Sequence, residues 1–141
     1  MTTTEAVRDH LLSGRRAWVE RVLDCATAVA ASWDGSSVGE RDRVVGPFRA
    51  ALGRSGALDT APTVLAECVQ AAGTQLRAQP VAKPPYVVVT GAGLVLRATL
   101  EETRLVVRVA PFAVRRDPRR YVHTASAPET AVAVDCRPAP P

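Results

Sequence analysis

The hydrophobic period of the sequence changes at one place, the proline-rich stretch AQPVAKPPY at residues 78–86. Before this stretch apolar residues recur at steps of three and four, which is typical of amphipathic helices. After it they alternate with polar residues, which is typical of half-buried strands. Proline lacks a backbone N–H and its predecessor avoids helical angles, so no helix continues through the stretch. The sequence therefore predicts an α+β fold, with helices first and an antiparallel sheet after them.

The helical part, residues 3–79, is expected to hold three helices. Thr2 and Glu5 have the spacing of a capping box, which satisfies free N–H groups in the first turn of a helix. An apolar stripe that includes Trp18 then predicts one helix as far as Trp33, about eight turns long. Gly14 is its expected kink.

Two further helices follow before the proline-rich stretch. Ser37 and Glu40 repeat the capping-box spacing and predict the start of the second helix. Pro47 removes a backbone donor there, so a kink or a late start is expected. Asp59 or Thr60 is the expected cap of the third helix. All three helices are amphipathic and need a surface to cover.

The sheet part, residues 85–136, contains the strand-like stretches YVVVT, LVLRATL, LVVRVAPFAV and RRYVHTA, with TAVAVD as a possible further strand. Gly91–Gly93 reads as a hairpin turn. We expect the three helices to pack on one face of an antiparallel meander of three to five strands. Residues 1–136 then form a single domain, and residues 137–141 are expected to be a disordered tail.

Two arginines on neighbouring strands raise a question about the outer face of this sheet. A symmetric turn at Glu101–Arg104 places Arg97 directly opposite Arg108, and like charges so placed repel. Three arrangements would relieve the repulsion: a bound phosphate or carboxylate, an acidic side chain from a helix or a partner chain, or side chains that splay into water. The sequence leaves these alternatives open.

The net charge of +4 comes entirely from residues 80–141. Residues 1–79 hold nine arginines and nine acidic residues, whereas residues 80–141 hold nine basic and five acidic residues. Such an asymmetry is typical either of a solvated basic face or of a surface that meets anions. The candidate anion or nucleic-acid binding residues are Arg97, Arg108, Arg115, Arg116, Arg119 and Arg120.

No catalytic residue, metal ligand or cofactor is assigned. TGAGL contains a GxG, but no helix follows it as a dinucleotide fingerprint requires. His10 and His123 lack matched ligand spacing for a metal. The three cysteines are far apart, which suits a reducing cytoplasm, and no stretch is apolar enough to suggest a membrane span. An enzyme is therefore the least favoured class.

The stretches PPYVVVT and VLRAT, at Pro84–Thr90 and Val95–Thr99, resemble a group of small uncharacterised proteins of halophilic archaea. The resemblance covers mainly residues 80–112 and implies no activity and no site residues. The basic charge departs from the usual halophile pattern. In molar salt the screening length falls to about 3 Å, so only direct contacts with an anion would survive there.

The favoured function is a non-enzymatic protein-interaction or oligomerisation module in the cytoplasm, with another protein or a second copy as its partner. Trp18, Trp33 and the apolar stripe of the first helix are its expected contact or core residues. The alternative is binding of an anion or a nucleic acid through the arginine-rich sheet face. Nucleic-acid binding is the less favoured of the two, because few aromatic residues are available for stacking.

Overall fold

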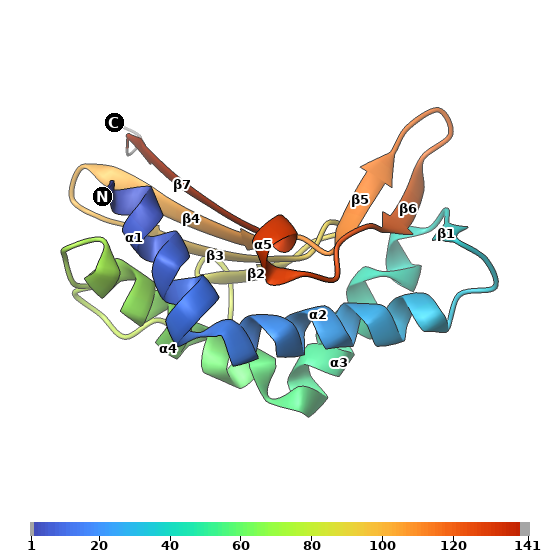
Figure 1. Cartoon of the computed structure of the whole chain (residues 1–141), viewed down its shortest axis with the longest axis horizontal. Coiled ribbons are helices and arrows are strands. Elements are labelled where there is room, and N and C mark those ends of the chain that lie inside the picture. The colour runs from blue at the N-terminus through green and yellow to red at the C-terminus, as the bar shows by residue number, and fades with distance from the viewer. Residues whose placement is uncertain (1, 139–141) are drawn as a thin grey trace.

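The computed structural model describes residues 2–138 and confirms the α+β fold. Helices fill the N-terminal half and antiparallel strands the C-terminal half (Figure 1). The helices form one layer, and a four-stranded sheet lies on it; in the described part of the chain no helix lies on the other face of this sheet. A second, three-stranded sheet stands at one end of the molecule.

The first predicted helix is two helices joined by a distorted turn. The Thr2–Glu5 capping box opens α1 (Thr3–Asp9), and both of its reciprocal hydrogen bonds are present at 3.1 Å. A π-helical segment, His10–Gly14, follows, and α2 (Arg16–Ala31) continues beyond it. The helix is thus interrupted at Gly14, the residue expected to kink it, because glycine holds helical angles weakly.

The capping residues of the next two helices were predicted wrongly. Ser37 lies in a short strand, β1 (Ser37–Val38), and a 3₁₀ turn separates it from α3 (Val45–Ser55). Pro47 lies in the first turn of α3, where a missing N–H costs nothing, so the late start was the correct alternative. α4 (Ala57–Ala71) begins ahead of Asp59 and Thr60, because Gly56, at φ 85°, both ends α3 and precedes α4.

The four-stranded sheet has the order β2-β3-β4-β7 and is antiparallel throughout. Its inner face packs on α1, α2, α3 and α4. The turn at Gly91–Gly93 joins the first two strands of this sheet, as predicted. Gly93 has φ 154° and lies close to Val109. A Cβ atom at Gly93 would be only 2.1 Å from the Val109 carbonyl oxygen. The strands are β2 (Val87–Val89), β3 (Leu94–Thr99), β4 (Thr103–Val109) and β7 (Val132–Pro138).

The strands do not form one meander, because the chain leaves the sheet at Pro111. Pro111 has no N–H for a ladder, and β4 ends just before it, at Val109. The chain then forms the hairpin of β5 (Phe112–Arg115) and β6 (Arg120–His123), which pairs with β1 in the order β1-β6-β5. A short helix, α5 (Pro128–Ala131), returns the chain to β7.

The last strand was only partly expected. TAVAVD was predicted as a possible strand, and β7 confirms it. Arg137 and Pro138 also belong to β7, so the prediction of a disordered tail is wrong for them; residues 139–141 lie outside the described part of the chain. Arg8 of α1 donates hydrogen bonds to the carbonyls of Val132 and of Glu129 (2.7 Å), which tie the first helix to the last strand.

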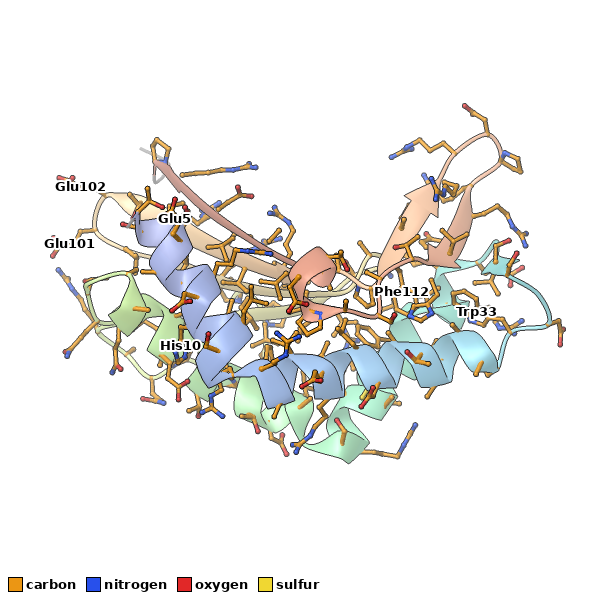
Figure 2. The ribbon with its side chains drawn as sticks, viewed as in Figure 1. Glu5, His10, Trp33, Glu101, Glu102 and Phe112 are labelled. Carbon is orange, nitrogen blue, oxygen red and sulfur yellow. The ribbon has the colours of Figure 1, made fainter. Side chains whose placement is uncertain are left out.

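The core lies between the helices and the four-stranded sheet. Trp18 and Trp33 are buried inside the chain; the Trp18 indole N–H donates to the Ala57 carbonyl at 3.0 Å. Trp33 meets Phe112 where the β5–β6 hairpin joins the helices (Figure 2). The apolar stripe of the first helix is therefore occupied within the chain. Association with another protein stays a prediction that would need a different surface.

Candidate anion-binding face

The outer face of the four-stranded sheet carries most of its charged side chains. Alternation along β3 and β4 was predicted correctly: the leucines and Ala98 point to the helices, and the arginines point away from them. We call the side away from the helices the outer face. Its residues on the paired strands are Val88, Val95, Arg97, Thr99, Arg104, Val106, Arg108, Ala133, Asp135 and Arg137.

The predicted opposition of Arg97 and Arg108 is wrong. Arg97 pairs with Val106, and Arg108 pairs with Val95. The turn is tighter than a loop over Glu101–Arg104, because Leu100 N donates to Thr103 O at 2.7 Å and only Glu101 and Glu102 remain in the loop. This moves the register by two residues, which preserves the faces but changes the partners.

Arg108 is neutralised by a neighbouring strand. Its guanidinium donates to the Asp135 carboxylate of β7 at 2.7 Å. One of the three open alternatives, an acidic partner, is thus realised for Arg108, although the acid comes from the sheet itself. Asp135 also lies 3.6 Å from Arg137, so one carboxylate serves two arginines.

The sheet does place two arginines face to face, at a different position. Arg104 of β4 lies directly opposite Arg137 of β7, and both point outward. Arg97 lies diagonally from Arg104 on β3, so three guanidinium groups cross three neighbouring strands. Among residues 2–138, no carboxylate oxygen lies within 4.0 Å of a guanidinium nitrogen of Arg97 or Arg104.

Sequence reasoning missed Arg104 and Arg137. Arg104 was assigned to the turn, and Arg137 to the tail. Continuing the alternation of AVAVD through Arg137 would have placed that residue on the same face as Asp135. The pairing of β7 with β4 joins residues that the whole β5–β6 hairpin separates, so no local signal shows it.

The outer-face arginines lie on a small apolar base. Val95 and Val106 are only 8% and 6% exposed although no helix covers this face, and neither joins the core cluster. Val106 is the cross-strand partner of Arg97, and Val95 that of Arg108. We infer that the aliphatic stems of the arginines cover these valines and so restrict where the guanidinium groups reach.

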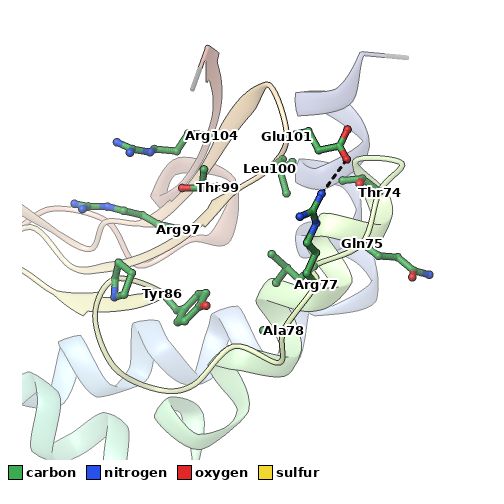
Figure 3. A pocket seen from close by; sticks show the side chains of 12 residues that line it. Thr74, Gln75, Arg77, Ala78, Tyr86, Arg97, Thr99, Leu100, Glu101 and Arg104 are labelled. Carbon is green, nitrogen blue, oxygen red and sulfur yellow. Dashed lines mark ion pairs between the residues drawn. The ribbon is translucent and has the colours of Figure 1, made fainter. Parts of the chain in front are cut away.

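A pocket of about 700 Å³ opens where this face meets the segment between α4 and β2. Arg97 and Arg104 border it and extend in the same direction, with Thr99 between them (Figure 3). Across the pocket, Arg77 lies 3.6 Å from Glu101, and both side chains are largely exposed. Tyr86 lines the pocket below Arg97, with its ring half-buried.

Comparison with family models matches residues 5–137 to a domain of unknown function, DUF7988. The chain belongs to this family. The match includes every outer-face residue, from Val88 of β2 to Arg137 of β7. No curated protein and no solved structure matches the chain.

The other predicted arginines of this DUF7988 protein form a separate group at the tip of the β5–β6 hairpin (Figure 1). Arg115 lies directly opposite Arg120, and Arg116 and Arg119 belong to the turn. Arg120 donates to the hydroxyl and the carbonyl of Ser37 at 2.9 and 3.0 Å, so it holds β1 to the hairpin. The six predicted residues therefore lie on two surfaces, and Arg120 has a structural contact of its own.

A second polar cluster lies among the helices. The carboxylate of Glu67 on α4 accepts hydrogen bonds from Nε and Nη2 of Arg15, at 2.7 and 2.6 Å. It also accepts one from the Nε2 atom of the His10 ring, at 2.9 Å. The Arg15 hydrogen bonds, more than the one from His10, hold the pKa of the Glu67 carboxyl below its ordinary value. All the acceptor oxygens of this cluster are used within the chain, so it offers little to a ligand.

Residues 2–138 offer neither a metal site nor a membrane-spanning helix. Within residues 2–138, no group of three or more His, Cys, Asp or Glu side chains is placed to hold a metal ion. In the same part of the chain, no helix has the length and apolar character needed to cross a membrane.

Proposed function

We propose that this protein binds single-stranded nucleic acid through the outer face of its four-stranded sheet, as a binding protein and not as an enzyme. The observation that carries the proposal is the pair of arginines, Arg97 and Arg104, for which no carboxylate partner lies among residues 2–138. The face holds four arginines and one aspartate.

Guanidinium groups suit phosphate because their planar forks donate two parallel hydrogen bonds to its oxygens. Arg104 and Arg137 repel one another in the free protein, and a phosphate between them would remove that repulsion. An open sheet face fits a flexible single strand, whose bases can turn toward the protein. Within residues 2–138, no helix stands on this face to enter a duplex groove.

We place this activity in the cytoplasm. Cys25, Cys68 and Cys136 are all free thiols, which supports a reducing compartment. If the protein works in molar salt, its phosphate contacts must be direct, because diffuse attraction is screened there.

The test is a fluorescence-anisotropy titration of labelled mixed-sequence single-stranded DNA and RNA at low and at molar salt. The variant that replaces both Arg97→Ala and Arg104→Ala should weaken binding by about ten-fold or more at low salt. Losing two phosphate contacts should also reduce the slope of log affinity against log salt by about 1.4.

The matched control replaces Arg49→Ala and Arg54→Ala on α3, two exposed arginines on the helical side of the molecule. It removes the same charge from another surface and should bind nearly as the parent does. Equal losses in both double variants would mean that only net charge matters and would contradict the proposed face. An unmodified protein that binds neither probe at low salt would overturn the function itself.

A further inference from the structure

The pocket beside Arg97 and Arg104 has two chemically different walls. The sheet side is lined by Arg97, Thr99 and Arg104, and the two arginine side chains extend in the same direction, away from Arg77 (Figure 3). The other side presents Leu76, Pro85 and the ring of Tyr86. The volume of about 700 Å³ lies within the ~300–1,000 Å³ range of small-molecule sites.

We propose that this pocket receives one nucleotide unit, with its phosphate on Arg97 and Arg104 and its base against Tyr86. The inference rests on the proposed function and deepens it, because it names the part of the ligand that the pocket selects. A free 5′-mononucleotide and a unit of a single strand present the same chemistry, and the experiment distinguishes them.

The backbone places Tyr86, which directly precedes β2, next to Arg97 of β3. Arg97 N donates to the Tyr86 carbonyl at 2.8 Å, so the aromatic ring and the phosphate-binding arm belong to hydrogen-bonded neighbours. The backbone N–H of Tyr86 also donates a hydrogen bond to the Lys83 carbonyl at 3.0 Å, which fixes the backbone of Tyr86. The backbones of Tyr86 and Arg97 are thus adjacent, and a nucleotide unit has to extend from the partly buried ring of Tyr86 to the guanidinium of Arg97 on the outer face (Figure 3).

The charge of the pocket favours an anion. Three arginines and one carboxylate, Glu101, line it. Arg77 lies 3.6 Å from Glu101, and the pair is 91% and 85% exposed, so water screens it strongly. This exposed pair lies across the pocket from Arg97 and Arg104 (Figure 3), and neither of its side chains is buried. The two arginines of the sheet remain available for the phosphate.

Each wall alone serves only half of a nucleotide. Inorganic phosphate would meet the arginines without using the apolar wall, and adenosine would meet Tyr86 without using the charges. Adenosine 5′-monophosphate (AMP) uses both walls and should bind the protein at least ten-fold more tightly than either fragment, as measured by isothermal titration calorimetry.

Three variants test the assignment. Tyr86→Ala removes the stacking surface and should weaken AMP binding roughly ten-fold. Tyr86→Phe keeps the ring and should bind AMP within about two-fold of the parent protein. Arg104→Ala changes a side chain that lies outside the core, so it should fold normally and lose AMP affinity by a similar factor. Thermal unfolding confirms that each variant is folded.

The titrations separate failure of the pocket from failure of the function. Tight binding of the oligonucleotide, with no binding of AMP and no effect of Tyr86→Ala, would overturn the pocket and leave nucleic-acid binding in place. Binding of AMP without binding of the oligonucleotide would support the pocket, identify the free nucleotide as the ligand and overturn the proposed function. Equal affinities for AMP and inorganic phosphate would overturn the role of Tyr86.

Discussion

At the scale of single residues, Glu67 is the acid with the richest set of partners. The guanidinium of Arg15 donates two hydrogen bonds to its carboxylate, and the ring of His10 makes a third. Both members of the Arg15–Glu67 pair are 29% exposed, so water screens them only in part. Because α4 supplies Glu67 while the π-helical segment and the residue after it supply His10 and Arg15, this cluster fixes the junction of α1 and α2 against α4.

We expect this cluster to make stability depend on pH in acid. The folded chain holds the pKa of Glu67 below its ordinary value of 4.5, so the carboxylate binds a proton less readily in the folded than in the unfolded state. Its contribution is therefore complete above the unfolded value and is lost as the pH falls through the folded one. Glu67→Gln should lower the free energy of unfolding by about 1–2 kcal/mol at pH 7 and by much less near pH 3.

The control is Glu102→Gln, because Glu102 sits in the exposed turn between β3 and β4 and has no ion pair within residues 2–138 (Figure 2). Urea unfolding at a series of pH values measures both variants. A Glu67→Gln deficit that is the same at pH 3 and pH 7 would show that lost packing, and not the ion pair, causes it.

At the scale of elements, two buried aromatic side chains, Phe112 of β5 and Tyr121 of β6, join the β5–β6 hairpin to the core, and Phe112 makes the ring contacts. Phe112 is 3% exposed and meets the rings of Trp33, Phe48 and His123 at centroid distances of 5.8, 5.4 and 5.9 Å. It is the first residue of β5, directly after the proline that takes the chain out of the larger sheet. Phe112 therefore joins the smaller sheet to the core.

Phe112→Ala should lower the free energy of unfolding by about 3–5 kcal/mol, because it removes a buried ring and leaves a cavity. Loosening of the hairpin should also shift the fluorescence of Trp33 toward longer wavelengths. Val114→Ala is the control on the same strand: Val114 is 39% exposed, and its truncation should change stability by less than about 0.5 kcal/mol. Similar losses in both variants would contradict this role of Phe112.

The elements also show how far sequence reasoning reaches. The change of period at residues 78–86 predicted the helical and sheet halves, and alternation put Arg97 and Arg108 on the outer face. Their partners could not be predicted, because the register depends on which residues close the turn. The pairing of Arg108 with Asp135 and the pocket beside Tyr86 depend on contacts between distant segments, for which the sequence carries no local signal.

At the scale of the whole molecule, the three thiols differ in how much of the fold must open to expose them. Cys68 is fully buried, and burial raises its pKa to about 12. Cys25 is buried on α2, and Cys136 is half-buried on the last strand. Access to Cys68 therefore requires the helices to separate from the sheet.

With a thiol reagent at pH 8, we expect Cys136 to react first and Cys68 to react only at the rate of global unfolding. A thiol with a pKa of about 12 is ionised in only about one molecule in ten thousand at that pH, and the folded chain also blocks the reagent. Mass spectrometry of labelled peptides measures the order. A Cys68 that reacts as fast as Cys136 would reveal local opening of α4 without unfolding of the rest.

Arg8 of α1 donates hydrogen bonds to Glu129 of α5 and to Val132, the first residue of β7, and this has a consequence for the synthesis of the chain on the ribosome. A ribosome adds about 5–20 residues per second. The 124 residues between Arg8 and Val132 therefore separate the appearance of α1 from that of the strand it packs on by roughly 6–25 seconds. During this interval the apolar side chains of α1 lack part of their final cover. During those seconds a nascent chain exposes apolar side chains of α1 that β7 covers in the folded protein.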